Sequence, residues 1–498
     1  MFFLGVDNSP ARTRTVVLNL EDASVVAEAE QPHSLVEDLP AGHREQDPMQ
    51  WIHAVDQTVR HCLQSIGPAR ERISGIGVSG QPQGLVALDA GNRILRPAKL
   101  HGDSSADRES EELSRAFGGP PGLIELAGNP MSPTRTAAKI LWLKQREPHH
   151  FQQTASLLQP HDFINFWLSG VKRTEFGDAS ESGLLDIRNR RWCRQLLDYI
   201  DPGLEELLPP VKSSREAHGV LRGDLAKAWG LGEDILVSAG GANDMMAAIG
   251  AGAVDPGSVA VSLGDGGAIC GVSGSPLIDP QGEIAAYCDA TDHWMPLAGD
   301  GRAAAFVAQT QRHYAWTAEQ MEMAITAAPP GAGGLIVLPA VRPSRAAYVP
   351  AGRGLVYGIT GDNFSAINVA RAAVEAAALE MGRGLNRMVA LGLVPSEVRI
   401  MGRHGDSPAW RQVIADVLGL PVYGARATAC PSTGAALQAA VTFFHRSGED
   451  LSYGEITSYA VEPAEESRCD PDPARHAHYK DLLERQRTLA GIVHHDGC

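Results

Sequence analysis

ILVSAGGANDMMAAIG, residues Ile235 to Gly250, is the stretch that decides the fold of this chain. It begins with apolar residues, breaks at two glycines, carries the polar pair Asn243 and Asp244, and resumes with small and apolar residues. This order predicts a buried strand, a tight turn and the start of a helix, where free N–H groups attract polar ligands. Asp244 is therefore a candidate catalytic carboxylate. The alternative is that it only caps its helix.

Length and composition limit the class of protein. With 498 residues the chain exceeds one ordinary core, so two domains are expected. A hydrophobic content of 44% with 53 glycines is typical of a folded α/β protein. Because 59 acidic residues outweigh 43 basic ones, nucleic acid and anionic membranes are poor partners for this chain.

Cysteine usage and apolar runs indicate the compartment. The seven cysteines contain no C-x-x-C pair, so neither a zinc cluster nor a disulfide framework is predicted. The start, MFFLGVD, lacks basic residues, and we interpret it as a first strand rather than a signal peptide. No apolar run approaches the roughly 20 residues that cross a bilayer. We expect a soluble, cytoplasmic protein with no membrane partner.

The first half of the chain predicts strands followed by helices. The strands are Phe2–Asp7, Arg14–Leu20, Val25–Ala29, Ile73–Val78 and Leu85–Leu88. The helices are 48–66, 107–117, 137–144 and 163–168. The turn-rich Asn8-Ser9-Pro10-Ala11 joins the first two strands into a hairpin. The polar, small residues Thr174–Asp186 predict a loop near a site.

The second half repeats this logic, and we predict a boundary after Gly250 that gives domains 1–250 and 251–498. Val259–Leu263, a glycine-rich turn and Ala268–Val272 form a second predicted hairpin, as expected of a duplicated fold. Asn363–Leu391 is the strongest helix signal, since it is alanine-rich and apolar at helical spacing. The remaining predictions are a strand at 398–401 and helices at 407–418 and 433–443.

The opening of the chain resembles the actin-like and ribonuclease H-like ATPase fold. It has two antiparallel strands with a polar turn, then a third strand and a helix. The resemblance implies that the first turn faces nucleotide phosphates and that Asp7 handles Mg²⁺. A solvated turn aspartate is the alternative interpretation of Asp7.

Longer stretches resemble the FGGY carbohydrate kinases, and within that family the xylulokinases. They are GHREQDPMQW (42–51), IGVSGQPQGLVALD (76–89), AAKILWLKQREP (137–148), GDASESGLLDI (177–187), SAGGANDMMAAIGAG, CDATDHWMPL, INVARAAVEAA, SPAWRQVIADVLGLPV and TGAALQAA. The resemblance implies an α/β fold of two actin-like (ribonuclease H-like) ATPase domains with an interdomain cleft. Residues 1–250 would bind the sugar and 251–498 the nucleotide.

The resemblance also implies roles for individual residues. The sugar contacts would be Gln81, Gln83, Asp103 and Asn243. The nucleotide contacts would be Gly264, Asp265, Gly266, Gly402, Arg403 and Asp406. ATP and Mg²⁺ would be the cofactors and a ketose such as D-xylulose the substrate. A homodimer is a further expectation, and no nucleic acid partner is expected.

The chain departs from the family pattern where the chemistry belongs. The family's Gly-Gly-Gly-Asp-Asn becomes residues 240–244, so Asn243 stands where the catalytic base is assigned. An amide has no useful basicity, and Asp244 would have to replace it across about 100° of helix rotation. The first phosphate turn lacks its glycine, and Asp265 puts a carboxylate that repels phosphate into the second.

Three functions remain open on these residues. The first is an ATP-dependent ketose kinase with Asp244 as its catalytic base. The second is a pseudokinase that keeps the fold and binds a sugar or a partner without turning over ATP. The third is a kinase with a changed donor or acceptor, which would use Arg403, His404 and Asp265 as new contacts.

Overall fold

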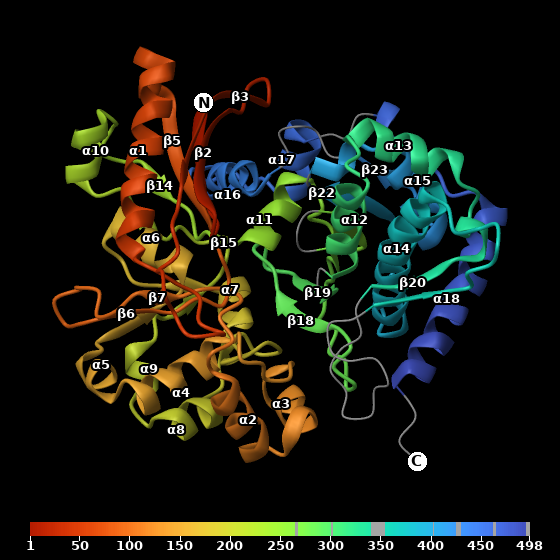
Figure 1. Ribbon diagram of the computed structural model, residues 1–498. Helices are drawn as coiled ribbons and strands as arrows, with labels where there is room; N and C mark the ends of the chain where they lie inside the picture. The colour runs from red at the N-terminus through yellow and green to blue at the C-terminus, as the bar shows by residue number, and fades with distance from the viewer. Residues whose placement is uncertain are drawn as a thin grey trace. The chain divides into compact units, whose positions relative to one another are not determined.

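The computed structural model describes residues 1–263, 267–299, 302–339, 354–401, 403–424, 430–461 and 465–494. They form two compact units (Figure 1). Unit 1 comprises Met1–Pro256, Val272–Met295 and Thr428–Glu462, and unit 2 comprises Gly257–Gly271, Pro296–Ala427 and Pro463–Cys498. Segments from the second half of the sequence therefore complete unit 1. Both units combine sheets and helices, so the predicted α/β class is confirmed. The domain boundary after Gly250 stays a prediction.

The main sheet of unit 1 has the strand order β13-β14-β5-β1-β2-β3, with β15 paired to β5. Its strands are β1 (Phe2–Asn8), β2 (Arg12–Asn19), β3 (Ser24–Pro32), β5 (Ile73–Gly80), β13 (Gly219–Val220), β14 (Leu236–Val237) and β15 (Gly241–Ala242). The predicted hairpin is confirmed, because β1 pairs antiparallel with β2. β1 also pairs parallel with β5, and this register sets Asp7 beside Ser79.

Helix α1 (Pro48–Ile66) covers one face of this sheet and has the bounds that the sequence predicts. Asp47 caps its start by accepting a hydrogen bond from the Met49 N–H at 2.9 Å. Gly67 ends it with a φ of 57°. Its apolar side, which includes Trp51 and Val55, packs into one core with Leu4 and Val6 of β1 and other buried residues of this face.

Helix α16 (Pro431–Arg446) packs against the opposite face, which the alternate residues of β1 and β5 present (Figure 1). The approach is close enough to require glycine. A Cβ at Gly5 would lie 1.8 Å from the Ser432 carbonyl oxygen, and one at Gly77 would lie 1.9 Å from that of Ala435. A late segment of the chain thus supports the strands that carry the site.

Residues 235–250 fold as predicted, into β14, the turn with β15, and helix α11 (Asn243–Gly250). Helix α16 also holds this turn. Gln438 accepts hydrogen bonds from the Ser238 hydroxyl and the Gly240 N–H, both at 2.8 Å. A Cβ at Gly434 would lie 1.8 Å from the Met246 carbonyl oxygen, so α11 and α16 also cross in close contact.

The rest of unit 1 is built from shorter elements. Its other helices are α2 (Asp107–Ala116), α3 (Gly119–Ala127), α4 (Thr136–Arg146), α5 (Pro148–Gln153), α6 (Pro160–Ser169), α8 (Arg194–Ile200), α9 (Leu204–Leu207), α10 (Gly223–Trp229) and α17 (Tyr453–Ala460). Its other strands include β4 (Glu45–Gln46), β6 (Val86–Leu88), β7 (Ala98–Lys99), β8 (Ser156–Leu158) and β18 (Ala285–Cys288).

The prediction of a loop over Thr174–Asp186 is wrong. The segment contains β9 (Thr174–Glu175), α7 (Phe176–Glu181) and β10 (Leu185–Asp186). The buried Glu175 caps α7 by accepting hydrogen bonds from the N–H groups of Gly177 and Asp178, at 2.6 and 2.5 Å. Burial and this cap stabilise the helix. The sequence did not predict it, because its small polar residues lack the apolar period that marks a surface helix.

Unit 2 has its own sheet. Strand β16 (Ser258–Ser262) pairs antiparallel with β17 (Ala268–Gly271) and parallel with β22 (Glu397–Met401), so the second predicted hairpin is confirmed. β19 (Trp294–Ala298) pairs with β17, and β23 (Val422–Tyr423) with β22. Helix α14 (Ala366–Ala390) is the predicted long helix. The other elements include α12 (Arg302–His313), α13 (Ala318–Ala327), α15 (Pro408–Leu418), α18 (Pro473–His494), β20 (Ile336–Leu338) and β21 (Leu355–Tyr357).

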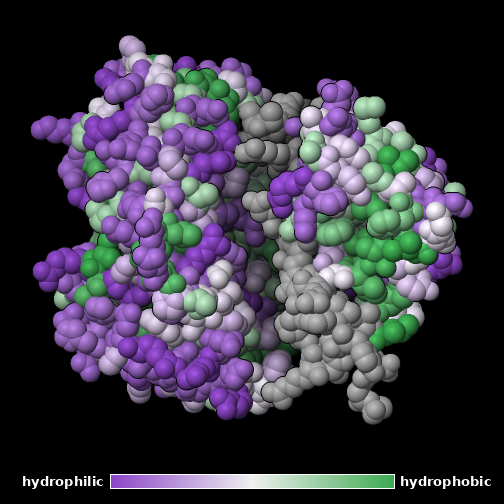
Figure 2. Space-filling model, viewed as in Figure 1, coloured by the Kyte–Doolittle hydropathy of each residue, from purple (hydrophilic) through white to green (hydrophobic). Residues whose placement is uncertain are grey.

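The visible surface of unit 1 is largely polar. Its visible face is mostly hydrophilic, with small apolar patches between the polar side chains (Figure 2). In the part of the chain that the structure describes, no helix combines the length and apolarity needed to cross a membrane.

Candidate functional site

Three polar side chains meet in unit 1 where β1 and β5 end and α11 begins. The Asp7 carboxylate accepts hydrogen bonds from the Ser79 hydroxyl at 2.8 Å and from the Asn243 amide at 2.5 Å. The Asn243 amide also donates to the Ser79 hydroxyl oxygen at 3.0 Å. Burial raises the pKa of Asp7 to about 6, although both hydrogen bonds oppose the rise. Asn243 therefore serves as a donor to a carboxylate.

Asp244, the next residue, lies in a different environment. The N-cap position of α11 is Ala242, and no side chain caps this helix end, so the capping alternative does not hold for Asp244. Burial raises the pKa of Asp244. Its charge contributes, after larger causes, to the raised pKa values of Glu181 on α7 and Tyr287 on β18. Adjacent helical positions differ by about 100°, which explains the separation of the two side chains.

Two glutamines line the same part of unit 1, after the end of β5. Gln81 is 1% exposed, and its amide oxygen and nitrogen are both without a hydrogen-bond partner among the described residues. Gln83, which adopts a φ of 58°, donates to Glu181 Oε2 at 3.0 Å and leaves its own amide oxygen unpartnered in this part of the chain. Buried amides are costly unless a ligand or water completes their hydrogen bonds. The arrangement suits a ligand rich in hydroxyl groups.

Cationic side chains support Gln83 and its partner Glu181. The buried Lys139 ammonium donates to the carbonyl oxygens of Gln83 and Leu100 at 2.7 and 2.8 Å, and burial lowers its pKa to about 7. Arg135 donates to the Glu181 carbonyl oxygen at 3.0 Å, and its guanidinium lies 5.1 Å from the centre of the Tyr287 ring. Lys139 thus fixes the Gln83 backbone, and Arg135 fixes the end of α7.

Sequence reasoning missed four residues of this cluster as site residues: Arg135, Lys139, Glu181 and Tyr287. Lys139 and Glu181 lie inside stretches that resemble the family, and that was the only signal for them. The contacts that bring them to Gln83 join residues 56 and 98 positions apart, so no local pattern reveals them.

Asp103 lies near Lys139, because its N–H donates at 3.1 Å to the Leu100 carbonyl oxygen that Lys139 also contacts, but protein groups occupy its carboxylate. Its oxygens accept hydrogen bonds from the Arg44 N–H at 2.7 Å and from the Ser105 N–H and hydroxyl at 3.1 and 2.6 Å. The Lys99 ammonium lies 3.4 Å away. Among the described hydrogen bonds, none joins Asp103 to the two glutamines or to α11. A sugar contact for Asp103 stays a prediction.

The predicted nucleotide residues belong to unit 2. Gly264, Asp265, Gly266 and Gly402 lie outside the described residues. Arg403 begins a short 3₁₀ helix, Arg403–Asp406, that follows β22, and Asp406 at its end is exposed. Their role in nucleotide binding stays a prediction.

Asp7 is the predicted metal ligand, and a carboxylate suits Mg²⁺ chemically, because Mg²⁺ takes oxygen ligands. A second cluster, of His161, Asp162 and Asp178, is fully buried. There the imidazole contacts Asp178 at 2.5 Å and Asp162 at 3.0 Å, and the two carboxylates hold the pKa of His161 well above its usual range. The charged imidazolium makes this cluster an internal ion pair.

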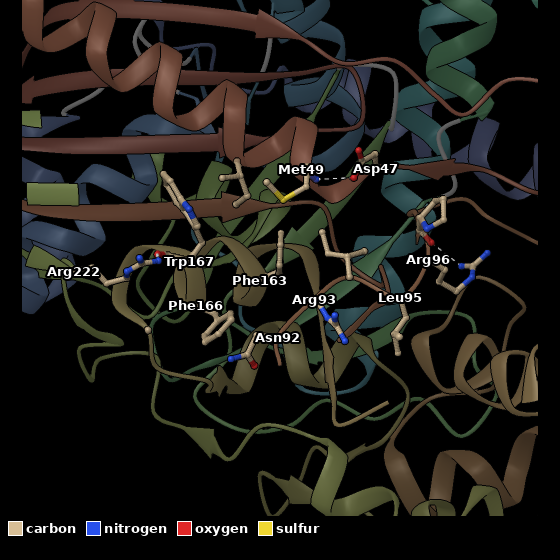
Figure 3. Close-up of a pocket in the computed structure, with 14 residues that line it drawn as sticks. Asp47, Met49, Asn92, Arg93, Leu95, Arg96, Phe163, Phe166, Trp167 and Arg222 are labelled. Atoms are coloured by element: carbon tan, nitrogen blue, oxygen red, sulfur yellow. Dashed lines mark hydrogen bonds between the residues drawn. The ribbon is translucent and has the colours of Figure 1, made fainter. Parts of the chain in front are cut away.

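A separate pocket of about 1010 Å³ lies between α1, the β6–β7 connection and α6 (Figure 3). Its walls are apolar side chains such as Met49, Phe163 and Trp167, with Arg93 and Arg222 at its margin. Both arginines are paired with neighbouring carboxylates, Asp89 and Asp224. None of the predicted site residues lines this pocket, so it is distinct from the candidate site.

Comparison with known proteins defines the class to which this fold and site belong. Family models for the N- and C-terminal domains of the FGGY family of carbohydrate kinases match residues 2–250 and 260–443. The chain is 31% identical to a xylulose kinase of Haemophilus influenzae over 98% of its own length and 99% of that protein. It is 28% identical to a xylulose kinase of Escherichia coli, over 98% of each chain.

Solved structures agree with this assignment. A xylulose kinase from Rhodospirillum rubrum superposes with a TM-score of 0.88 at 25% identity, over 99% of both chains. A Plasmodium falciparum glycerol kinase with ADP, at 17% identity, shares the fold with a TM-score of 0.84 over 98% of this chain and 97% of that one. The chain therefore belongs to the FGGY family of carbohydrate kinases. The predicted family and two-domain fold class are confirmed, and the pseudokinase alternative gains no support from these relatives.

Proposed function

We propose that this protein transfers the γ-phosphoryl group of ATP to a hydroxyl group of a ketose such as D-xylulose. The full-length similarity to two bacterial xylulose kinases supports the reaction and the substrate class. The buried, unpartnered amides of Gln81 and Gln83 support a polyhydroxylated ligand in unit 1.

In the proposed reaction, Asp244 is the general base. A hydroxyl oxygen of the ketose forms a bond to the γ-phosphorus, the bond from that phosphorus to the ADP oxygen breaks, and the hydroxyl proton passes to the Asp244 carboxylate. Asp7 would hold Mg²⁺, which neutralises phosphate charge when bound. Asn243 and Ser79 would keep the Asp7 carboxylate oriented through their hydrogen bonds to it.

One observation carries this assignment. Helix α11 starts without a side-chain cap, which leaves the Asp244 carboxylate available near Glu181 and its partner Gln83. The Asn243 amide is committed to Asp7 and Ser79. General-base catalysis contributes on the order of 10²- to 10⁴-fold to rate, so a proton acceptor at this place is worth about 3 to 5 kcal/mol of barrier.

The test is ADP release by the purified protein with MgATP and a panel of ketoses, with sugar binding followed in parallel by calorimetry. We expect D-xylulose or a related ketose to stimulate ADP release well above the rate without sugar. Sugar binding without any ketose-dependent ADP release would instead favour the pseudokinase. Turnover with another donor or a non-ketose acceptor alone would favour the third hypothesis, a kinase of changed specificity.

A further inference from the structure

We propose that Glu181 is a neutral hydrogen-bond donor that positions the ketose beside Asp244. This inference rests on the proposed function and names a substrate-positioning residue that the family pattern does not supply. Three features of the structure lead to it: the place of the side chain, the partners of its two oxygens, and the charges around it.

Glu181 is the last residue of α7 and is 4% exposed. Its Oε2 accepts the hydrogen bond from the Gln83 amide at 3.0 Å. Among the described residues no hydrogen bond reaches its Oε1, which is also not among the fully buried polar atoms. Arg135 donates its hydrogen bond to the main-chain oxygen of Glu181, and its charge acts on the carboxyl group only at longer range.

The groups around Glu181 are mainly acidic. Asp178 lies on the same helix and Asp244 on α11, while the Arg135 charge acts in the opposite direction. Burial and the two aspartates raise the pKa of Glu181 to about 8. The other titratable side chains on elements packed against α7 are Glu175 on β9, Asp186 on β10, Lys212 on β12 (Val211–Lys212), and Tyr287 and Cys288 on β18.

A protonated carboxyl group offers one O–H donor while its other oxygen still accepts. In this cluster Oε2 accepts from Gln83, which leaves the proton on Oε1 to be donated to a ligand. The carbonyl or a hydroxyl oxygen of a ketose is a suitable acceptor. A neutral Glu181 also avoids a second negative charge next to Asp244, which has to stay ionised to accept a proton.

Deprotonation of Glu181 would remove the donor and place a second anion beside Asp244. We therefore expect ketose binding to weaken as the pH rises above about 8. A glutamine at this position keeps a neutral donor of similar shape that does not titrate. The Glu181→Gln variant should thus keep the affinity of the protonated enzyme above about pH 8.

The experiment measures the dissociation constant of D-xylulose by calorimetry without nucleotide, from about pH 6 to about pH 9.5. It compares the unmodified protein with Glu181→Gln, Glu181→Ala and the control Glu111→Gln, an exposed glutamate on α2. For the unmodified protein and the control we expect affinity to fall above about pH 8 and to level off on the order of tenfold below its value at neutral pH. Glu181→Gln should show no such fall above about pH 8, and Glu181→Ala should bind on the order of tenfold more weakly already at neutral pH.

The same alkaline loss of affinity in Glu181→Gln, or unchanged affinity in Glu181→Ala, would overturn the proposal, as would the absence of ketose binding. Since the readout is binding, it is independent of phosphoryl transfer. Normal ketose binding with the expected pH behaviour, but without ADP release, would reject the kinase reaction and leave the role of Glu181 standing.

Discussion

The substitution Glu181→Gln should stabilise the protein against unfolding, and more strongly at about pH 8 than at about pH 5. The carboxyl has an ordinary pKa of 4.5 and a pKa of about 8 in the folded chain. Between these values the folded protein holds a proton that the unfolded chain has released. The unfolding free energy therefore falls as the pH rises through this interval. Glutamine does not titrate and removes this loss.

The size of the effect follows from the same interval. From 4.5 to about 8, at about 1.4 kcal/mol per pKa unit, the loss has a ceiling of roughly 5 kcal/mol. Any water that reaches Oε1 reduces it. The hydrogen bond from Gln83 can be kept by the amide oxygen of the glutamine, so the substitution costs little at acidic pH.

Urea unfolding followed by intrinsic fluorescence, without ligands and at pH values between about 5 and 8, measures the difference. Glu111→Gln is the matched control, because Glu111 is exposed and should leave the pH dependence unchanged. An unfolding free energy of Glu181→Gln that falls with pH as steeply as that of the unmodified protein would refute the reasoning. So would a variant less stable than the unmodified protein at about pH 8.

Two further predictions test the close packing of α11 against α16 and the hydrogen bond from Asn243 to Asp7. Gly434→Ala should lower the unfolding free energy by about 1 to 3 kcal/mol and reduce the thermal midpoint, since its Cβ meets a backbone oxygen at 1.8 Å. Gly223→Ala, with no atom within 4 Å of the new Cβ, should change little, and equal effects would contradict the packing argument. Asn243→Ala removes a donor from Asp7, so the pKa of Asp7 should rise above about 6. The acidic limb of the pH–rate profile with MgATP should then move to higher pH, and an unmoved limb would separate Asp7 from catalysis.

Local chemistry explains which elements could be predicted from the sequence. Helix α1 has its predicted bounds because Asp47, Pro48 and Gly67 mark its ends. The strand, turn and helix that the sequence predicts for residues 235–250 are also present in the structure. Two glycines separate the apolar run of the strand from the apolar run of the helix. Where such markers are present, sequence and structure agree closely.

The errors and omissions have physical reasons as well. Helix α7 was missed because its cap, Glu175, and its surroundings are buried, so it lacks the polar face of a surface helix. The different environments of Asn243 and Asp244 depend on where α11 begins, and the sequence left a helix cap and a catalytic role equally open. The contact of Gln83 with Glu181 crosses 98 residues, and only the fold brings the two together.

Asp244 is the proposed catalytic base, and the rate of D-xylulose phosphorylation by Asp244→Asn tests this role most directly. The control is Asp234→Asn, which changes an exposed aspartate just before strand β14. Both variants are measured with saturating MgATP. We predict that kcat falls on the order of 10²- to 10⁴-fold in Asp244→Asn, with ketose binding kept, and is unchanged in Asp234→Asn. A kcat of Asp244→Asn close to that of the unmodified protein would show that another group accepts the proton.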